Sequence, residues 1–327
     1  MSEIKQLNVI QAVNLALEDA MTADPKVLIL GEEVGDKQEG GVMGVTKGLS
    51  AKFGDRVRST PISEQAIIGA AIGAAVGGYK VVAEIMLMNF TTVAMDMIVN
   101  HAAKLRFMSG GQTGVPIVIR MMTGAGISSA GQHSDFLEAW FAHTAGIKVV
   151  APSNPDDAYG LMRSAIEDND PVLFIENLPT YWTPGPVTCQ HVPIGKAKVS
   201  AEGTDVTVVA HSKMVIEALA AAKTLAKEGI SLEIIDLRTI SPWDRATVLA
   251  SAEKTGRAII VHEAVKQFGI GAEIASVISE ELWRKLKAPV KRLGGAFSPV
   301  PFSKPLETAF APTAADIAAA ARAIVAA

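Results

Sequence analysis

The side chains best suited to chemistry in this sequence are a glutamate, a histidine and an aromatic residue. Glu64 stands just before a run of small and apolar residues, His133 ends a loop rich in glycine and serine, and Phe90 follows an apolar strand pattern. A carboxylate and an imidazole can exchange protons with a substrate, and an aromatic ring can contact a flat heterocycle. The sequence therefore predicts an acid–base site that contains these three residues.

The segment after Glu64 predicts a helix. Residues 65–79 carry no charge, Ser63 could cap the helix, and three glycines spaced by four residues fall on one ridge. Because no face is polar, we expect this helix to be buried on all sides. It is too short to cross a bilayer, which takes about 20 apolar residues. A purely structural role for Glu64, as an acid favoured by the helix dipole, stays open.

Composition favours an ordinary two-domain enzyme. The 327 residues are 49% hydrophobic and 20% charged, with a formal charge of −4. No basic cluster suggests nucleic acid as a partner, and no stretch predicts a membrane span. The single Cys189 excludes an internal disulfide and a multi-cysteine metal site. The first ten residues lack the layout of a signal peptide, so we expect a cytoplasmic protein.

Strand and helix patterns alternate through the whole chain. The strands are continuously apolar, which is typical of parallel sheets covered by helices on both faces. Residues 178–195 lose this periodicity, contain four prolines and predict a linker. The predicted fold class is α/β with two doubly wound domains, at 1–190 and 191–327. The predicted strands are 26–30, 80–86, 115–120, 148–152, 171–176, 205–210, 232–236, 257–262 and 290–293, and the main predicted helices are 9–21, 45–53, 65–79, 90–108, 135–144, 154–167, 214–228, 243–254, 271–286 and 313–325.

Common nucleotide and hydrolase motifs are missing from the sequence. Gly124-Ala-Gly126 and Gly269-Ile-Gly271 each give only the first two glycines of G-x-G-x-x-G. There is also no Walker loop, no H-E-x-x-H and no G-x-S-x-G. A dinucleotide-binding dehydrogenase of the Rossmann type is therefore not predicted.

Several sequence blocks, in order, resemble one family over nearly the whole length. The chain is similar to the β subunit of the thiamine-diphosphate-dependent component of 2-oxo acid dehydrogenase complexes, in the pyruvate and acetoin dehydrogenase branch of the transketolase superfamily. The resemblance implies a transketolase-like pyrimidine-binding domain followed by a transketolase C-terminal-like domain. The blocks are LGEEV at 30–34, GVMGVTKG at 41–48, TPISE at 60–64, EIMLMNF at 84–90, VPIVIR at 115–120, QHS at 132–134 and DLRTISP at 236–242.

The resemblance implies a role for each candidate residue. Glu64 matches a glutamate that hydrogen-bonds the aminopyrimidine of thiamine diphosphate and helps to deprotonate the thiazolium carbon, for which an apolar setting favours the protonated carboxyl. His133 matches a loop histidine that faces the reacting carbon. Phe90 matches an aromatic beside the pyrimidine, although it could be plain core. Glu32 matches an acid that couples paired active sites, although it could be a solvated loop acid.

The resemblance also implies ions and partners. A structural potassium ion would bind mainly to backbone carbonyls at Ile117, Ala165, Ile166, Asp168 and Asp170. The family's magnesium motif, Gly-Asp-Gly with a later asparagine, does not occur in this chain. Magnesium and the diphosphate would therefore bind to an α subunit, in a heterotetramer of two α and two β chains that serves a lipoyl-bearing acyltransferase core.

Two other functions stay open on the sequence alone. A split transketolase-like or acyloin-forming enzyme would use the same Glu64 chemistry with an aldehyde as the acceptor. A non-catalytic assembly subunit would keep Glu64 for structural reasons. The substrate, a 2-oxo acid or acetoin, is not specified, because Met121-Met122 and Met86-Leu-Met88 depart from the family pattern near the expected substrate side.

Overall fold

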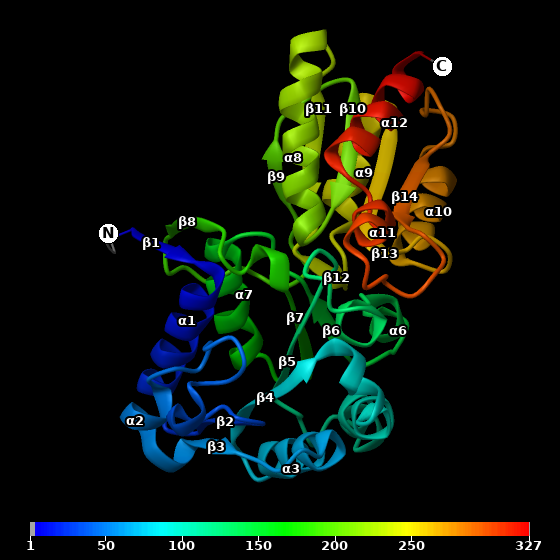
Figure 1. The fold of residues 1–327 in the computed structure, drawn as a ribbon. Helices are drawn as coiled ribbons and strands as arrows, with labels where there is room; N and C mark the ends of the chain where they lie inside the picture. The colour runs from blue at the N-terminus through cyan, green and yellow to red at the C-terminus, as the bar shows by residue number, and fades with distance from the viewer. Residues whose placement is uncertain (1–3, 327) are drawn as a thin grey trace. The chain divides into compact units, whose positions relative to one another are not determined.

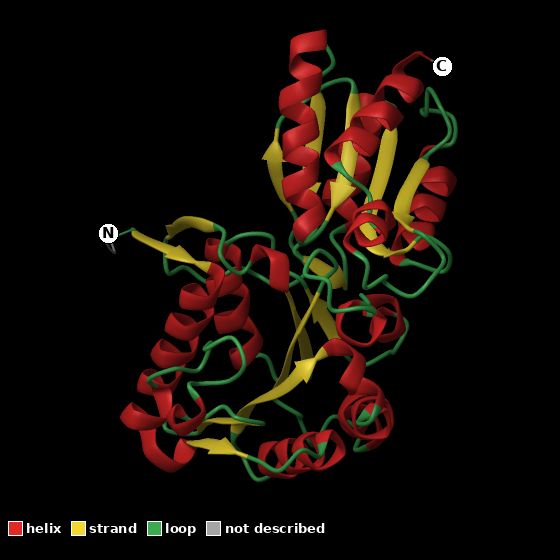
Figure 2. Cartoon of the chain, in the orientation of Figure 1, coloured by secondary structure: helices red, strands yellow, loops and turns green. Residues whose placement is uncertain are grey.

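The computed structural model of the chain describes residues 4–326, which form two compact units (Figures 1 and 2). The first unit contains the chain up to Thr123 together with Trp140–Ile194, and the second contains Gly124–Ala139 and the chain from Gly195 onward. Each unit has a mostly parallel sheet with helices packed on it, so the predicted α/β fold class is confirmed. The two units differ from the predicted division at 190/191 in two places. The boundary falls at 194/195, and residues 124–139 belong to the second unit, whose side chains bond to their backbone.

The first unit is organised by six parallel strands in the order β6-β7-β5-β4-β2-β3. Every residue of β5 and β7 is buried, as expected for central strands of a covered parallel sheet. Because the strands are parallel, their carboxyl ends meet at one edge of the sheet. The strands are β2 Val27–Gly31, β3 Val57–Ser59, β4 Lys80–Leu87, β5 Ile117–Thr123, β6 Lys148–Val150 and β7 Val172–Asn177.

Helices cover both faces of this sheet. Helices α1 Val9–Ala23 and α7 Pro155–Glu167 pack against each other on one side, and α3 Glu64–Val76 lies on the other (Figure 1). Both of these helices are capped, since Asn8 forms a capping box with Gln11 before α1, and the Asn154 side chain accepts from the backbone amide of Asp157 at the start of α7. Shorter helical segments are η1 Asp36–Gln38, α2 Leu49–Phe53 and η2 Gly54–Arg56.

Burial of α3 on all sides is not observed. Ile67, Ile68 and Ala71 are buried against the sheet, whereas Ala66 and Gly73 are exposed. No atom of another described segment lies within 4 Å of the place where a Cβ of Gly73 would stand. Among the described residues the helix packs on the sheet and on residues 97–102, and an apolar outer face that includes Ala66, Ala70 and Gly73 stays exposed. The side chain of Ser63 also makes no capping hydrogen bond.

Residues 90–108 form a broken helix and not the continuous one predicted. A 3-10 turn, η3 Met88–Thr92, precedes a π-helical segment, η4 Met97–Ala102, and α4 Ala103–Met108 completes the stretch. Ile98 and Ala102 of the π-helical segment are buried. The wider π-helical turn shifts the period, which a 3.6-residue pattern cannot anticipate.

Part of the predicted linker forms regular structure. Strand β8 Pro184–Val187 pairs with β1 Lys5–Asn8, and η5 Leu178–Thr180 precedes it. The side chain of Tyr181 is fully buried, and its carbonyl accepts a hydrogen bond of 3.1 Å from the backbone of Val9. Prolines at an edge strand explain why the pattern resembled a linker.

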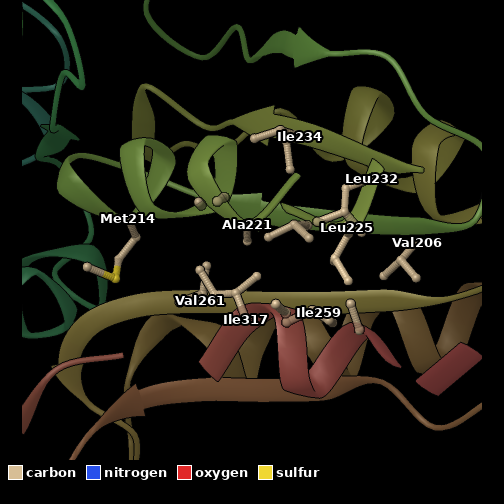
Figure 3. Packing of buried hydrophobic residues seen from close by; sticks show 14 of the residues in the cluster. Val206, Met214, Ala221, Leu225, Leu232, Ile234, Ile259, Val261 and Ile317 are labelled. Atoms are coloured by element: carbon tan, nitrogen blue, oxygen red, sulfur yellow. The ribbon is translucent and has the colours of Figure 1, made fainter. Parts of the chain in front are cut away.

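The second unit contains a five-stranded sheet in the order β14-β13-β10-β11-β9, in which only β9 is antiparallel. Apolar residues of α8 and α12 pack on one face of this sheet, and Met214, Leu225 and Ile317 belong to that core (Figure 3). Helices α9 and α10 contact each other and the strands. The elements are β9 Lys198–Ala201, β10 Val206–Ala210, α8 Lys213–Leu225, η6 Ala226–Glu228, β11 Leu232–Asp236, β12 Thr239–Ser241, α9 Arg245–Thr255, β13 Ala258–Val265, α10 Ile270–Leu282, β14 Lys291–Gly295, α11 Lys304–Phe310 and α12 Ala314–Ala326, with α5 Gly131–Ser134 and α6 Glu138–Ala142 after β5.

The C-terminal stretch Lys304–Ala326 is apolar and long enough to cross a membrane by composition. It is divided into α11 and α12, and Ile317 and Ala321 of α12 are buried in the core of the second unit. These two facts identify α12 as a core helix of a globular unit.

Candidate active site

The predicted site residues of the first unit lie at the carboxyl edge of its parallel sheet. Glu32 directly follows β2, Glu64 is the first residue of α3 after β3, and Phe90 lies in η3 after β4. The three strands are neighbours in the sheet, and the backbone of Thr60 donates to the carbonyl of Gly31 at 2.9 Å. Ligands of open α/β sheets bind at this edge, so the fold places these residues where a site is expected.

Glu32 and Glu64 form a buried acidic pair. They are 7% and 8% exposed. Burial raises the pKa of Glu32, and the nearby charge of Glu64 raises it further, with smaller contributions from Glu33 and Glu84. The Oε1 atom of Glu32 has no hydrogen-bond partner among residues 4–326. A buried carboxylate oxygen without a partner, next to a second buried acid, is suited to hold a polar group of a ligand.

Behind this pair lies a buried network of charges. Arg120 on β5 bonds to Glu84 on β4 and to Glu176 on β7. The hydroxyl of Tyr181 donates to Glu176 at 2.7 Å and lies 3.4 Å from Arg120. All four side chains are buried, and Glu84 also acts electrostatically on Glu32. The network therefore links the central strands to the acidic pair.

The electrostatic effects within this network follow from its burial. Burial raises the pKa of Glu84, although Arg120 opposes the shift. Burial disfavours the charged guanidinium of Arg120, but Glu176 and Glu84 outweigh it and raise its pKa. Burial also raises the pKa of Tyr181 well above its usual range. No role was predicted for Arg120, although one charged residue in each of three neighbouring apolar strands is a signal that the sequence contains.

His133 belongs to the second unit, whereas Glu32, Glu64 and Phe90 belong to the first. It lies in the short helix α5, is exposed, and its backbone amide donates to the carbonyl of Ala130 at 3.2 Å. Phe90 is half-buried. The structure therefore brings Glu32 and Glu64 together in the first unit, whereas His133 lies in α5 of the second unit.

Two domain families match the chain in sequence. The transketolase pyrimidine binding domain matches residues 5–181, and the transketolase C-terminal domain matches residues 195–317. The β subunit of acetoin:2,6-dichlorophenolindophenol oxidoreductase from Cupriavidus necator is 47% identical over 97% of each chain. The mitochondrial pyruvate dehydrogenase E1 component subunit beta-2 of Oryza sativa subsp. japonica is 46% identical over 97% of this chain and 86% of its own.

The chain belongs to the family of pyruvate and acetoin dehydrogenase β subunits. This confirms the resemblance drawn from the sequence blocks. Another bacterial member, the pyruvate dehydrogenase E1 component subunit beta of Leifsonia xyli subsp. xyli, is 43% identical over 95% of this chain and 92% of its own. The family assignment also places Glu32, Glu64 and Phe90 within its pyrimidine-binding domain.

Solved structures with the same fold are more distant in sequence. A split-gene transketolase, described as an inactive beta4 tetramer, superimposes with a TM-score of 0.80 at 23% identity and 98% coverage of both chains. A transketolase mutant from Pichia stipitis gives a TM-score of 0.70 at 16% identity, over 99% of this chain and 47% of its own. These likenesses support the two-domain transketolase fold of the β-subunit family.

The proposed potassium ligands of this β subunit lie around the end of α7. Ile117 begins β5, and Ala165 and Ile166 lie in the last turn of α7. All three residues are buried. The Asp168 carboxylate is bound by the ammonium of Lys148 at 2.7 and 2.6 Å. Carbonyl oxygens at the end of a helix suit a monovalent cation, but this carboxylate is already occupied by an ammonium.

Asp170, the fifth proposed ligand, is half-buried. It pairs with Arg106 at 2.6 Å and lies 3.5 Å from Lys148. A cavity of about 680 Å³, which Arg106, Phe107 and Gly146 also line, opens beside it. A cation here would depend on the backbone carbonyls, since the side chains already carry cationic partners.

Proposed function

We propose that this β subunit carries the pyrimidine half of a thiamine-diphosphate site in a 2-oxo acid or acetoin dehydrogenase. The complex would cleave the bond beside a carbonyl and pass the acyl group to a lipoyl-bearing acyltransferase. The observation that carries the proposal is the buried pair Glu32 and Glu64 at the carboxyl edge of a pyrimidine-binding domain.

The residues present fit this cofactor. When bound, thiamine diphosphate supplies an aminopyrimidine and a thiazolium carbon that adds to carbonyls. Glu64, buried beside Glu32, would hold or share a proton with a ring nitrogen. The Oε1 atom of Glu32, which has no partner within the described part of the chain, is an acceptor that a ligand can satisfy.

Phe90 and His133 also have proposed roles in this site. Phe90, half-buried at the end of β4, would contact the flat face of the pyrimidine. His133, exposed on its loop, would exchange protons with the substrate during cleavage and acyl transfer. The proposed active site therefore uses loops at the carboxyl edge of the sheet and a histidine from the following segment.

An α subunit would complete the site. Between residues 4 and 326 there is no cluster of three or more His, Cys, Asp or Glu side chains that could hold a metal ion, so we assign magnesium and the diphosphate to that partner. The exposed apolar face of α3 gives a second reason to expect a neighbouring chain. We propose an assembly of two α and two β subunits, with a potassium ion bound at the end of α7. We also propose a cytoplasmic location, although the plant relative is named as mitochondrial.

The alternative functions receive less support. The relatives with 46–47% identity are dehydrogenase β subunits, whereas the likeness to a split-gene transketolase, at 23% identity, concerns the fold. A purely structural Glu64 would not need a buried acidic neighbour with a raised pKa. Transfer to a lipoyl acceptor and transfer to an aldehyde can be separated by assaying the assembled complex with each acceptor.

The test is Glu64→Gln in the assembled α/β complex. Glutamine preserves shape but cannot ionise, so the complex should assemble while the thiazolium proton exchanges with deuterium about 10²-fold more slowly. Acid quench followed by NMR measures this step without knowledge of the substrate. Glu18→Gln is the matched control, because Glu18 makes only an exposed pair with Lys52. A wild-type exchange rate in the Glu64→Gln complex would refute the proposal.

A further inference from the structure

The loop that leads to His133 has an unusual backbone. Between the end of β5 and α5, four residues have positive φ angles: Gly124 at 118°, Gly126 at 125°, Ser128 at 57° and Ala130 at 62°. Serine and alanine rarely adopt such angles, and this conformation persists only when surrounding contacts impose it. The loop therefore depends on side chains that hold its backbone.

The side chain of Glu307 on α11 binds the backbone of this loop. Its carboxylate accepts from the backbone amide of Gly126 at 2.7 Å and from that of Ser128 at 3.0 Å, and the hydroxyl of Ser128 lies 3.3 Å away. Glu263 accepts from the amide of Ala125, whose carbonyl accepts from Lys213 at 3.1 Å. All of these residues belong to the second unit, so the contacts lie within one compact body.

Glu307 is itself fixed in place. It is 3% exposed, and its backbone amide donates to Ser303 at 2.8 Å. Three residues further on, Phe310 packs with Ala125 and Val300 in a small apolar cluster. A buried carboxylate that accepts hydrogen bonds from backbone amides on a packed helix is a rigid support for a loop.

We propose that Glu307 is a positioning residue for His133, acting by fixing the backbone of residues 124–130. This proposal rests on the proposed function, in which His133 exchanges protons with the substrate. Glu307 is 174 residues from His133 in sequence. Its effect would be on the orientation of the imidazole, not on ligand binding.

Glu307→Gln tests the proposal in the assembled α/β complex. Glutamine keeps the shape but replaces one acceptor oxygen with an NH₂ group, which would face the amide of Ser128 or Gly126. We expect kcat to fall about 10-fold with KM nearly unchanged, because a small misplacement of a catalytic group has effects of this size. Amide hydrogen exchange at residues 124–130 should also become faster. Glu253→Gln is the matched control, since Glu253 pairs with Lys285 on the exposed surface of the same unit.

A double-mutant cycle shows whether the effect passes through His133. We expect His133→Ala alone to lower kcat about 10²-fold. Adding Glu307→Gln to His133→Ala should then lower kcat less than twofold further, because there is no imidazole left to position. An equal 10-fold loss in both backgrounds, or wild-type kcat in Glu307→Gln, would overturn the proposal.

The same experiments separate this proposal from the proposed function. Thiazolium proton exchange depends on Glu64, so it should keep the wild-type rate in Glu307→Gln. If Glu64→Gln also leaves that exchange unchanged, the proposed function fails, whatever the cycle shows. If Glu307→Gln does not fold, Lys213→Met provides a second variant that removes only the bond to Ala125, and a smaller loss of kcat that again depends on His133 is expected.

Discussion

At the scale of single residues, Arg120 is important for stability because it neutralises two buried carboxylates. Its guanidinium lies between Glu84 and Glu176 in the interior of the first unit, and each of these carboxylates depends on it for charge compensation. A buried ion pair adds little net stability over an apolar replacement, but the loss of one partner leaves charge uncompensated. Replacing Arg120 alone should therefore lower the stability of the protein more than replacing Arg120, Glu84 and Glu176 together with apolar residues.

Arg120→Met should lower the free energy of unfolding of the first unit by about 3–5 kcal/mol, because two buried carboxylates lose their counterion. Urea unfolding followed by circular dichroism measures the change. Arg322→Met is the control, since Arg322 forms an exposed pair with Glu228 and should leave stability nearly unchanged. A change no larger than the control would show that the network is hydrated or compensated in solution.

Among the elements, α1 has the best-defined start. Asn8 accepts from the amide of Gln11 at 2.9 Å, and the Gln11 side chain accepts from the amide of Asn8 at 3.0 Å. The same residue ends β1, which pairs with β8 and so joins the chain start to residues near 187. The cap therefore fixes both a helix start and a strand end.

Asn8→Ala should destabilise the first unit by about 1 kcal/mol, the usual loss for an N-cap. Asn8→Asp keeps the accepting oxygen and should restore most of the stability. The midpoints of urea unfolding of the three proteins are the comparison to make, and equal midpoints for alanine and asparagine would contradict the role of the cap.

At the scale of the whole molecule, stability should depend on pH through buried groups of the second unit. Burial lowers the pKa of His211 to about 3, with help from His262, whose own pKa burial lowers to about 4. The unfolded chain binds protons at these histidines below pH 6.5, and the folded chain does not. Stability should therefore fall as pH drops from 6.5 towards 3.

Glu138 has the opposite effect on how stability depends on pH. Burial raises its pKa to about 8, and the nearby charge of Glu263 adds to the shift. The folded state thus keeps a proton that the unfolded state releases above pH 4.5, so stability should fall as pH rises from 4.5 to 8, by up to about 1.4 kcal/mol per pH unit.

Glu138→Gln should remove this second slope and raise stability at pH 8 relative to the unmutated chain, because glutamine needs no proton to be neutral. Urea unfolding at several pH values between 5 and 8 measures the slope. An unchanged slope in the variant would mean that Glu138 titrates normally in the folded state.

The isolated chain should bind thiamine diphosphate weakly, because the carboxylates that we propose for the pyrimidine lie in this chain, whereas residues 4–326 hold no cluster of side chains for a metal ion. Titration calorimetry with and without magnesium measures the affinity. Addition of the α subunit should increase it strongly, whereas tight magnesium-dependent binding by the chain alone would place the diphosphate site within this chain.

Local sequence determined the strands, most helices and the position of Glu64. Continuous apolar strands, helix caps such as Asn154 and the family blocks depend on residues that are close in sequence, so their pattern is readable without a structure. The predicted helix at 90–108 and the linker at 178–195 were wrong in part, because a π-helical turn and an edge strand rich in proline have weak local signals.

Only the tertiary structure decided which distant residues act together. Arg120 with Glu84 and Glu176, and Glu307 with the loop before His133, join residues that are far apart in the chain. The periodicity of the sequence does not predict such pairs, because they depend on the order of the strands in the sheet and on loop packing, and not on residues that are close in sequence. The sequence by itself therefore identified the groups that can do chemistry, whereas the fold decided which buried charges support them.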